Sequence, residues 1–98
     1  MITRIVRLTI QPEKIKDFKW QFESNYSSIS NFKGCRHLRL FRDAEEDNIF
    51  ITFSRWDSTE ALDAYRNSEL FRSTWATVKP MFEAAAVAFS MEEIYPVI

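Results

Sequence analysis

The chain has 98 residues, which is enough for one small domain with a single hydrophobic core. Its 13 basic and 14 acidic residues are interleaved and leave a net charge of −1, so we expect no nucleic-acid partner. Arg4 and Arg7 interrupt the apolar stretch at the N-terminus, and the single cysteine allows no intrachain disulfide, so we expect a cytoplasmic protein without a membrane span.

The first third of the chain has the patterns of a strand and a helix. Residues 2 to 10 alternate in the strand period, and their apolar face is broken only by Arg4. After Pro12, apolar residues recur at three- and four-residue steps to about Phe32, which predicts a long amphipathic helix. Gly34 then ends this helix, because glycine readily adopts the left-handed conformation found at helix C-termini.

The middle of the chain predicts a β-hairpin. Two strands are expected over residues 35 to 42 and 48 to 56, joined by a polar turn. Apolar side chains occupy both faces of the second strand: Ile49, Ile51 and Phe53 on one, Phe50 and Trp56 on the other. Because the chain has too few helices to cover both faces of a sheet, we expect a partner subunit in a homodimer to cover the second face.

Arginine is frequent on these two strands: Arg36, Arg39, Arg42 and Arg55. Such a group of cations can bind an anionic substrate. The adjoining turn carries Glu45, Glu46 and Asp47, so charge pairing across the strands is the default interpretation.

Two helices are expected in the next segment. Asp57, followed by Glu60, resembles the capping box of a short helix. Asn67 and Ser68 predict a break and a new N-cap, because both side chains compete for backbone donors. Pro80 should kink or end the second helix.

The segment from residue 84 to 94 fits either a helix or a strand. Its alanine-rich start favours a helix, whereas the alternation of Val87, Phe89 and Met91, which continues into IYPVI, favours a fourth strand. With that strand, the element order is the α+β ferredoxin-like arrangement βαββαβ, a four-stranded antiparallel sheet with helices on one face. Two such chains packed sheet to sheet would form a dimeric α+β barrel.

Three stretches carry a family pattern: IxRIVRLTI at the start, FKGCRHLRL near the middle, and SRWDSTEALDAYRNSELFRSTW over residues 54 to 75. They resemble the antibiotic biosynthesis monooxygenase domain of the dimeric α+β barrel superfamily, over nearly the whole chain, as a single domain from 1 to 98. The resemblance implies the fold and a homodimer. It leaves the reaction open, because the family includes cofactor-free oxygenases of polyketide anthrones, quinol monooxygenases and haem-degrading monooxygenases.

The resemblance disfavours haem degradation. Members of that branch use an Asn on the first strand, a Trp on the helix after the third strand, and a His further along as iron ligand. Val6, Tyr65 and Trp75 stand at the corresponding positions, and none of them matches. A tryptophan cannot ligate iron, and His37, the only histidine, lies on the second strand.

The cofactor-independent branch needs an apolar cavity, a hydrogen-bonding group and a base. In the mechanism attributed to it, an electron-rich phenol or anthrone loses a proton, and the resulting anion reduces oxygen without metal or flavin. We therefore predict that Tyr65 orients the substrate and that His37 is the base, since histidine titrates near neutral pH. Trp56, Phe71 and Trp75 are expected to line a pocket between the sheet and the helices of each chain, for a small aromatic or quinol-type molecule.

Other interpretations stay open, including whether the protein is an enzyme. The aromatic residues also fit a core, and His37 fits a dimer interface, on the same strand face as Cys35. The protein could be a non-enzymatic, dimeric small-molecule-binding module, or an isomerase of the same superfamily with His37 as proton shuttle. No cofactor and no metal site are predicted, because one His and one Cys make no ligand set without scattered carboxylates.

Overall fold

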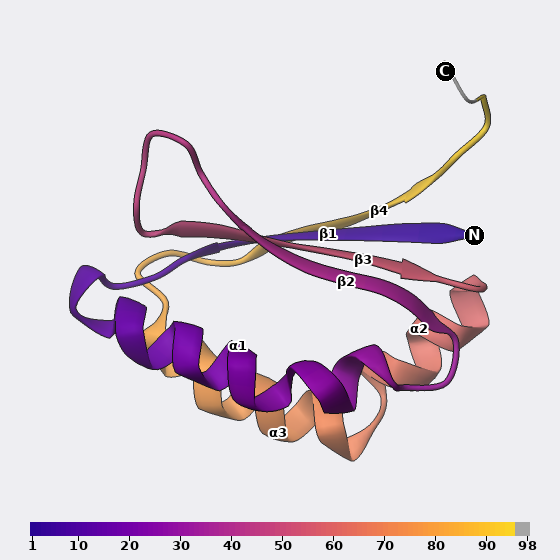
Figure 1. The fold of residues 1–98 in the computed structure, drawn as a ribbon, viewed down its shortest axis with the longest axis horizontal. Coiled ribbons are helices and arrows are strands. Elements are labelled where there is room, and N and C mark those ends of the chain that lie inside the picture. Colours follow the sequence, from indigo (N-terminus) through magenta and orange to yellow (C-terminus); the bar gives the residue numbers. More distant parts are fainter. Residues whose placement is uncertain (96–98) are drawn as a thin grey trace.

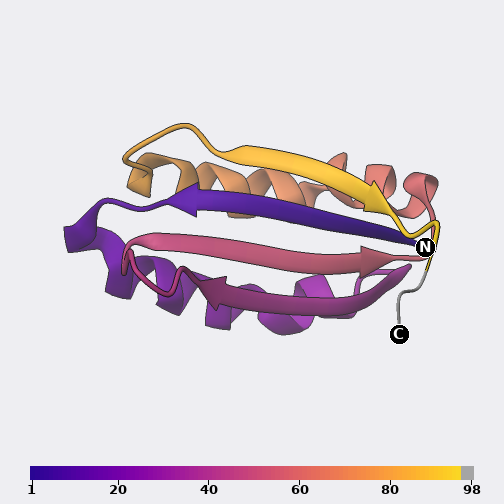
Figure 2. The ribbon, with the colours of Figure 1, turned by 90° about the horizontal axis from the view of Figure 1, so that it is seen from above.

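The computed structural model describes residues 1–95, and its central feature is a four-stranded antiparallel sheet with the strand order β2-β3-β1-β4. The helices and strands are β1 (Ile2–Thr9), α1 (Ile15–Ser30), β2 (Cys35–Arg42), β3 (Ile49–Trp56), α2 (Thr59–Arg66), α3 (Glu69–Val78) and β4 (Val87–Glu92). All three helices lie on one side of the sheet (Figure 1), and β4 runs beside β1 at one edge (Figure 2). The ferredoxin-like prediction is confirmed.

β1 is an inner strand that holds the sheet together. Ile5 lies opposite Phe53 of β3 on one side and opposite Phe89 of β4 on the other. Even-numbered residues of β1 face the helices, where Leu8 and its neighbours form the hydrophobic core: Leu8, Ile10, Phe18, Phe50 and Val78. Each side chain of this size contributes about 1.5–3 kcal/mol by leaving water.

The N-terminus of α2 differs from the prediction at residue 57. Ser58, not Asp57, is the N-cap, and its hydroxyl accepts a hydrogen bond from the backbone N–H of Ala61. Asp57 instead accepts two hydrogen bonds from the Arg36 guanidinium, with an Nε to Oδ1 distance of 2.6 Å. Arg36 therefore pairs with the start of α2 and not with the acidic turn.

The later helix and strand boundaries follow the sequence pattern. Ser68 is the N-cap of α3, and α3 ends at Val78, just before a 3-10 turn that contains Pro80. The ambiguous segment is a strand, β4, because the free edge of β1 offers backbone partners that outweigh the helix propensity of alanine. The last three residues of IYPVI lie outside the described residues.

Gly34 allows the tight connection between α1 and β2. Its φ of 91° is in the left-handed region, and a Cβ atom there would lie 2.5 Å from Cβ of Ala61. A β-bulge follows, between Cys35 and His37. The bulge changes the strand parity, so Cys35 lies opposite Trp56, and the prediction that Cys35 shares the face of His37 is wrong.

The sheet face opposite the helices is not covered by any of them (Figure 1). Phe41 is 48% exposed and Phe89 is 47% exposed. Eight apolar side chains belong to this face: Ile5, Phe41, Ile49, Ile51, Phe53, Val87, Phe89 and Met91. We call this side of the sheet the open sheet face, and no helix in residues 1–95 covers it. Separately, none of the helices in this part of the chain is long and apolar enough to cross a bilayer.

Candidate active site

A cavity of about 500 Å³ lies between the helix-facing side of the sheet and the three helices. Its floor comes from β1, β3, Leu38 of β2 and the start of β4, and its walls come from α1, α2, α3 and the loop before α3. The volume lies within the range of about 300–1,000 Å³ that is typical of small-molecule sites. The cavity is partly open to solvent.

Four aromatic rings form one continuous wall of this cavity. Tyr65 stacks on Trp56, with centroids 4.9 Å apart and an angle of 23°, and meets the edge of Phe71 at 5.3 Å. Phe71 in turn stacks on Trp75 at 5.6 Å. All four residues that the sequence suggested for the pocket wall or for orienting the substrate therefore lie together.

Trp56 also belongs to the core. It is 1% exposed, and its indole N–H donates a hydrogen bond of 2.9 Å to the buried hydroxyl of Ser54. This hydrogen bond satisfies the polar atom of a buried tryptophan and fixes the plane of its ring. The stacked Tyr65 ring thereby gains a rigid support.

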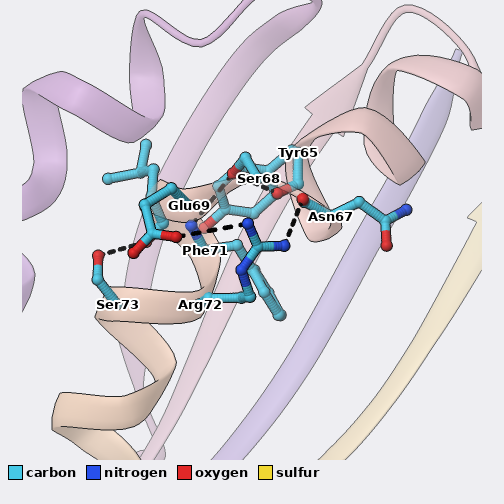
Figure 3. Close-up of polar contacts among 8 residues, drawn as sticks. Tyr65, Asn67, Ser68, Glu69, Phe71, Arg72 and Ser73 are labelled. Atoms are coloured by element: carbon cyan, nitrogen blue, oxygen red, sulfur yellow. Dashed lines mark hydrogen bonds and ion pairs between the residues drawn. The ribbon is translucent and has the colours of Figure 1, made fainter.

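The junction between α2 and α3 sets the positions of Tyr65 and Phe71 (Figure 3). The Ser68 hydroxyl donates a hydrogen bond of 2.6 Å to the Tyr65 carbonyl and accepts one of 3.1 Å from the Phe71 backbone N–H. Arg72 closes the junction by donating a hydrogen bond of 2.7 Å to the Asn67 carbonyl. The Ser68 hydroxyl therefore connects the backbones of Tyr65 and Phe71, the two residues whose rings meet in the cavity wall.

Tyr65 is a hydrogen-bond donor and not a base. Burial of its phenol, and to a lesser degree the nearby Cys35, raise the pKa of Tyr65 to about 12. The side chain is therefore neutral at physiological pH and carries an O–H group. Within residues 1–95 no hydrogen bond of this hydroxyl is found, and the Tyr65 side chain lines the cavity.

His37 lies on the opposite side of the sheet from this cavity. It is paired in register with Arg55, and its ring meets the edge of Phe53 on the open sheet face, with a centroid distance of 6.0 Å. Its Nε2 accepts a hydrogen bond of 2.7 Å from Arg39. The structure thus brings Tyr65 together with the three pocket-lining residues and separates them from His37 by the sheet.

Residues 1–77 match the family model described as antibiotic biosynthesis monooxygenase. The chain belongs to this family. The match spans β1 to the last turn of α3 and so includes the whole aromatic wall of the cavity. No curated protein matches the chain.

Solved structures with the same fold include other members of the antibiotic biosynthesis monooxygenase family. One antibiotic biosynthesis monooxygenase has 19% identity and a TM-score of 0.90, over 97% of this chain and 100% of that one. Rv0793 from Mycobacterium tuberculosis has 18% identity and a TM-score of 0.89, over 99% and 98%. A conserved protein from Methanosarcina mazei Go1 has 17% identity and a TM-score of 0.88, over 95% and 93%. At these identities the likeness concerns the fold alone.

Sequence reasoning missed the polar residues of the cavity in this monooxygenase family member. They are Arg4, Gln21, Asn25, Thr52, Ser54, Arg66, Asn67 and Thr74. Arg4 left a signal, because it alone breaks the apolar face of β1. Thr74 could not be recognised from the sequence. In the structure its buried Oγ1 has no hydrogen-bond partner in the described part of the chain. Among residues 1–95, no three His, Cys, Asp or Glu side chains converge as metal ligands.

Tyr65 should make the stability of the protein fall at alkaline pH. The pKa of its phenol is 10.0 ordinarily and about 12 when folded, so the unfolded chain loses this proton first. The stabilisation is complete below pH 10 and is lost as the pH rises to about 12. Denaturant unfolding across this range should show a steeper loss of the free energy of unfolding for the wild type than for Tyr65→Phe. Equal slopes would contradict the burial of the phenol.

Proposed function

We propose that this protein is a homodimeric, cofactor-independent monooxygenase that oxidises a small aromatic or quinol-type molecule in the cavity between its sheet and helices. The observation that carries the proposal is a cavity of about 500 Å³, walled by four aromatic rings, in a chain of the antibiotic biosynthesis monooxygenase family. The flat rings of the wall suit a flat, fused-ring substrate, because stacking of the substrate on these rings adds binding free energy to that from burying apolar surface.

Anthrone illustrates the reaction that such a cavity supports. Loss of a proton from its methylene carbon gives an anion, which transfers an electron to dioxygen. Recombination and uptake of a proton form a carbon hydroperoxide, and loss of water from it gives anthraquinone. Anthrone plus dioxygen therefore yields anthraquinone plus water, and no metal or flavin has to take up electrons.

The chain would contribute orientation and exclusion of water. Tyr65 would donate a hydrogen bond to the substrate oxygen, which stabilises the negative charge that develops there. Trp56, Phe71 and Trp75 would keep water from the anion, which makes the anion a stronger reductant. His37 lies on the opposite face of the sheet, so we assign it no step in this cavity, and an isomerase with His37 as proton shuttle is not proposed.

Oxygen uptake tests the reaction. The purified protein should consume one dioxygen per anthrone and form anthraquinone. Tyr65→Phe should lower kcat by about a hundredfold, which is typical for the loss of one donor to a developing oxyanion. Tyr26→Phe is the matched control, because Tyr26 is exposed on α1 and does not line the cavity.

The result also separates an enzyme from a binding module. If the protein binds anthraquinone but consumes no oxygen with anthrone or with hydroquinones, the monooxygenase proposal fails and the non-enzymatic binding module takes its place. If Tyr65→Phe changes the stability and leaves kcat unchanged, the role assigned to Tyr65 fails.

The homodimer in this proposal rests on the open sheet face. Its eight apolar side chains are too many to leave in water for a chain of this size, and an exposed group of this kind is typical of an interface. A second copy supplies a face of the same shape and chemistry, as two-fold symmetric dimers do. Sheet-to-sheet packing of two chains would form the dimeric barrel that the family resemblance implies.

Phe89→Glu should therefore convert the dimer to a monomer, because it would bury an unpaired charge in the interface. Light scattering coupled to gel filtration measures the mass directly. Trp20→Glu is the control, since Trp20 is a large apolar side chain that is 64% exposed on α1. A monomeric wild type, or a dimer that only Trp20→Glu dissociates, would contradict this arrangement.

A further inference from the structure

One arginine, Arg4, lines the cavity from the sheet that forms its floor. Arg4 lies on the helix-facing side of β1, in a row whose other members are apolar: Ile2, Val6 and Leu8. An arginine at such a position loses part of its hydration, which is costly for a charge unless a partner compensates it. Packing of the hydrophobic core therefore does not explain why an arginine occupies this position.

The partners of Arg4 leave most of its hydrogen-bonding capacity free. Its Nη1 donates one hydrogen bond of 3.0 Å to the Ser90 hydroxyl on β4. Within residues 1–95 the Arg4 guanidinium has no other side-chain hydrogen bond and no ion pair. A guanidinium has five N–H donors in a planar fork, which suits the two oxygens of a carboxylate or an adjacent pair of oxygens.

The charges around Arg4 do not neutralise it. Arg66 lines the same cavity, and the nearby Asp63 is engaged by Arg66, with an Nη2 to Oδ1 distance of 2.6 Å. Asp63 is thus the nearby carboxylate for both guanidinium groups, but it forms an ion pair only with Arg66. Burial and the repulsion from Arg66 lower the pKa of Arg4, whereas Asp63 raises it, so the positive charge of Arg4 is only partly compensated.

The side chains of residues 1–95 that line the cavity supply neither an anion nor a base. Among its lining residues in the described part of the chain there is no Asp, Glu, His or Lys. The phenol of Tyr65 stays protonated at physiological pH. A ligand with a negative charge would supply the missing counter-charge, and a ligand that arrives as an anion, or ionises beside Arg4, needs no basic side chain.

We propose that Arg4 is the anion-binding residue of the cavity and that the ligand is an aromatic molecule carrying an oxyanion, with its rings on the aromatic wall and its charged oxygens at Arg4. This inference rests on the proposed function and names the class of its substrate. Carboxylates, phenolates and enolates share this chemistry. For an anthrone or quinol, Arg4 would favour the ionised form, which is the form that reduces dioxygen.

Binding of naphthoate and of neutral naphthamide, two molecules of nearly equal shape, tests the inference by calorimetry at neutral pH. The wild type should bind naphthoate about tenfold more tightly or better, since hydrogen bonds to charged groups contribute about 1.5–3 kcal/mol. Arg4→Met, which keeps the length of the side chain and removes its charge, should abolish this preference and leave naphthamide binding in place. Raised salt should weaken only naphthoate binding.

Arg42→Met is the matched control, because Arg42 is exposed at the end of β2 and does not line the cavity. It should keep the preference for naphthoate. Arg66→Gln is a poor control, since it would leave Asp63 without its partner. Circular dichroism should confirm that Arg4→Met is folded, and retained naphthamide binding shows that its cavity is intact.

The outcomes separate the anion site from the oxygenase. Equal affinity of the wild type for naphthoate and naphthamide, no binding of either, or an unchanged preference in Arg4→Met overturns the inference, even if anthrone is oxidised. Preferential naphthoate binding that depends on Arg4, in a protein that consumes no oxygen with anthrone, supports the anion site and rejects the monooxygenase.

Discussion

The sheet of this protein has apolar side chains on both faces, whereas its helices cover only one. This imbalance determines the organisation of the molecule. On the covered side, Trp56 and Leu8 are buried between the sheet and the helices, and part of the volume there is occupied by large aromatic rings. On the bare side, the apolar residues of β1, β3 and β4 remain in contact with water until another surface covers them. We therefore propose separate roles for the two faces, ligand binding for the covered face and association for the bare one.

The cavity depends on how the rings are supported. The Trp56 indole is fixed by its hydrogen bond to Ser54, and Tyr65 stacks on it. Ser68 holds the backbones of Tyr65 and Phe71 together at the junction of α2 and α3. Rings constrained in this way cannot easily collapse into the space beside them, which is how a small domain can keep an apolar cavity next to its core.

Strand alternation and helix periodicity predicted the order of the elements, because β1 and β3 must place apolar residues toward the core at every second position. The expectation of a pocket between the sheet and the helices came from the family resemblance and not from these patterns, since the positions of Tyr65 and Trp75 depend on packing between distant segments. The bulge at Cys35 was also hidden, because an extra residue changes the strand parity without leaving a pattern in the sequence. His37 was a candidate base by residue type alone, and only the register of β2 places it on the open sheet face.

The central claim is that a small aromatic molecule binds between the sheet and the helices. The indole N–H signals of the three tryptophans, followed by nuclear magnetic resonance during titration with naphthoate, test this claim most directly. Trp75 lines the cavity, whereas Trp20 is 64% exposed on α1 and does not. The account predicts a saturable shift of the Trp75 signal with Trp20 unchanged. A shift of Trp20 alone, or no shift of any indole at saturating ligand, would contradict it.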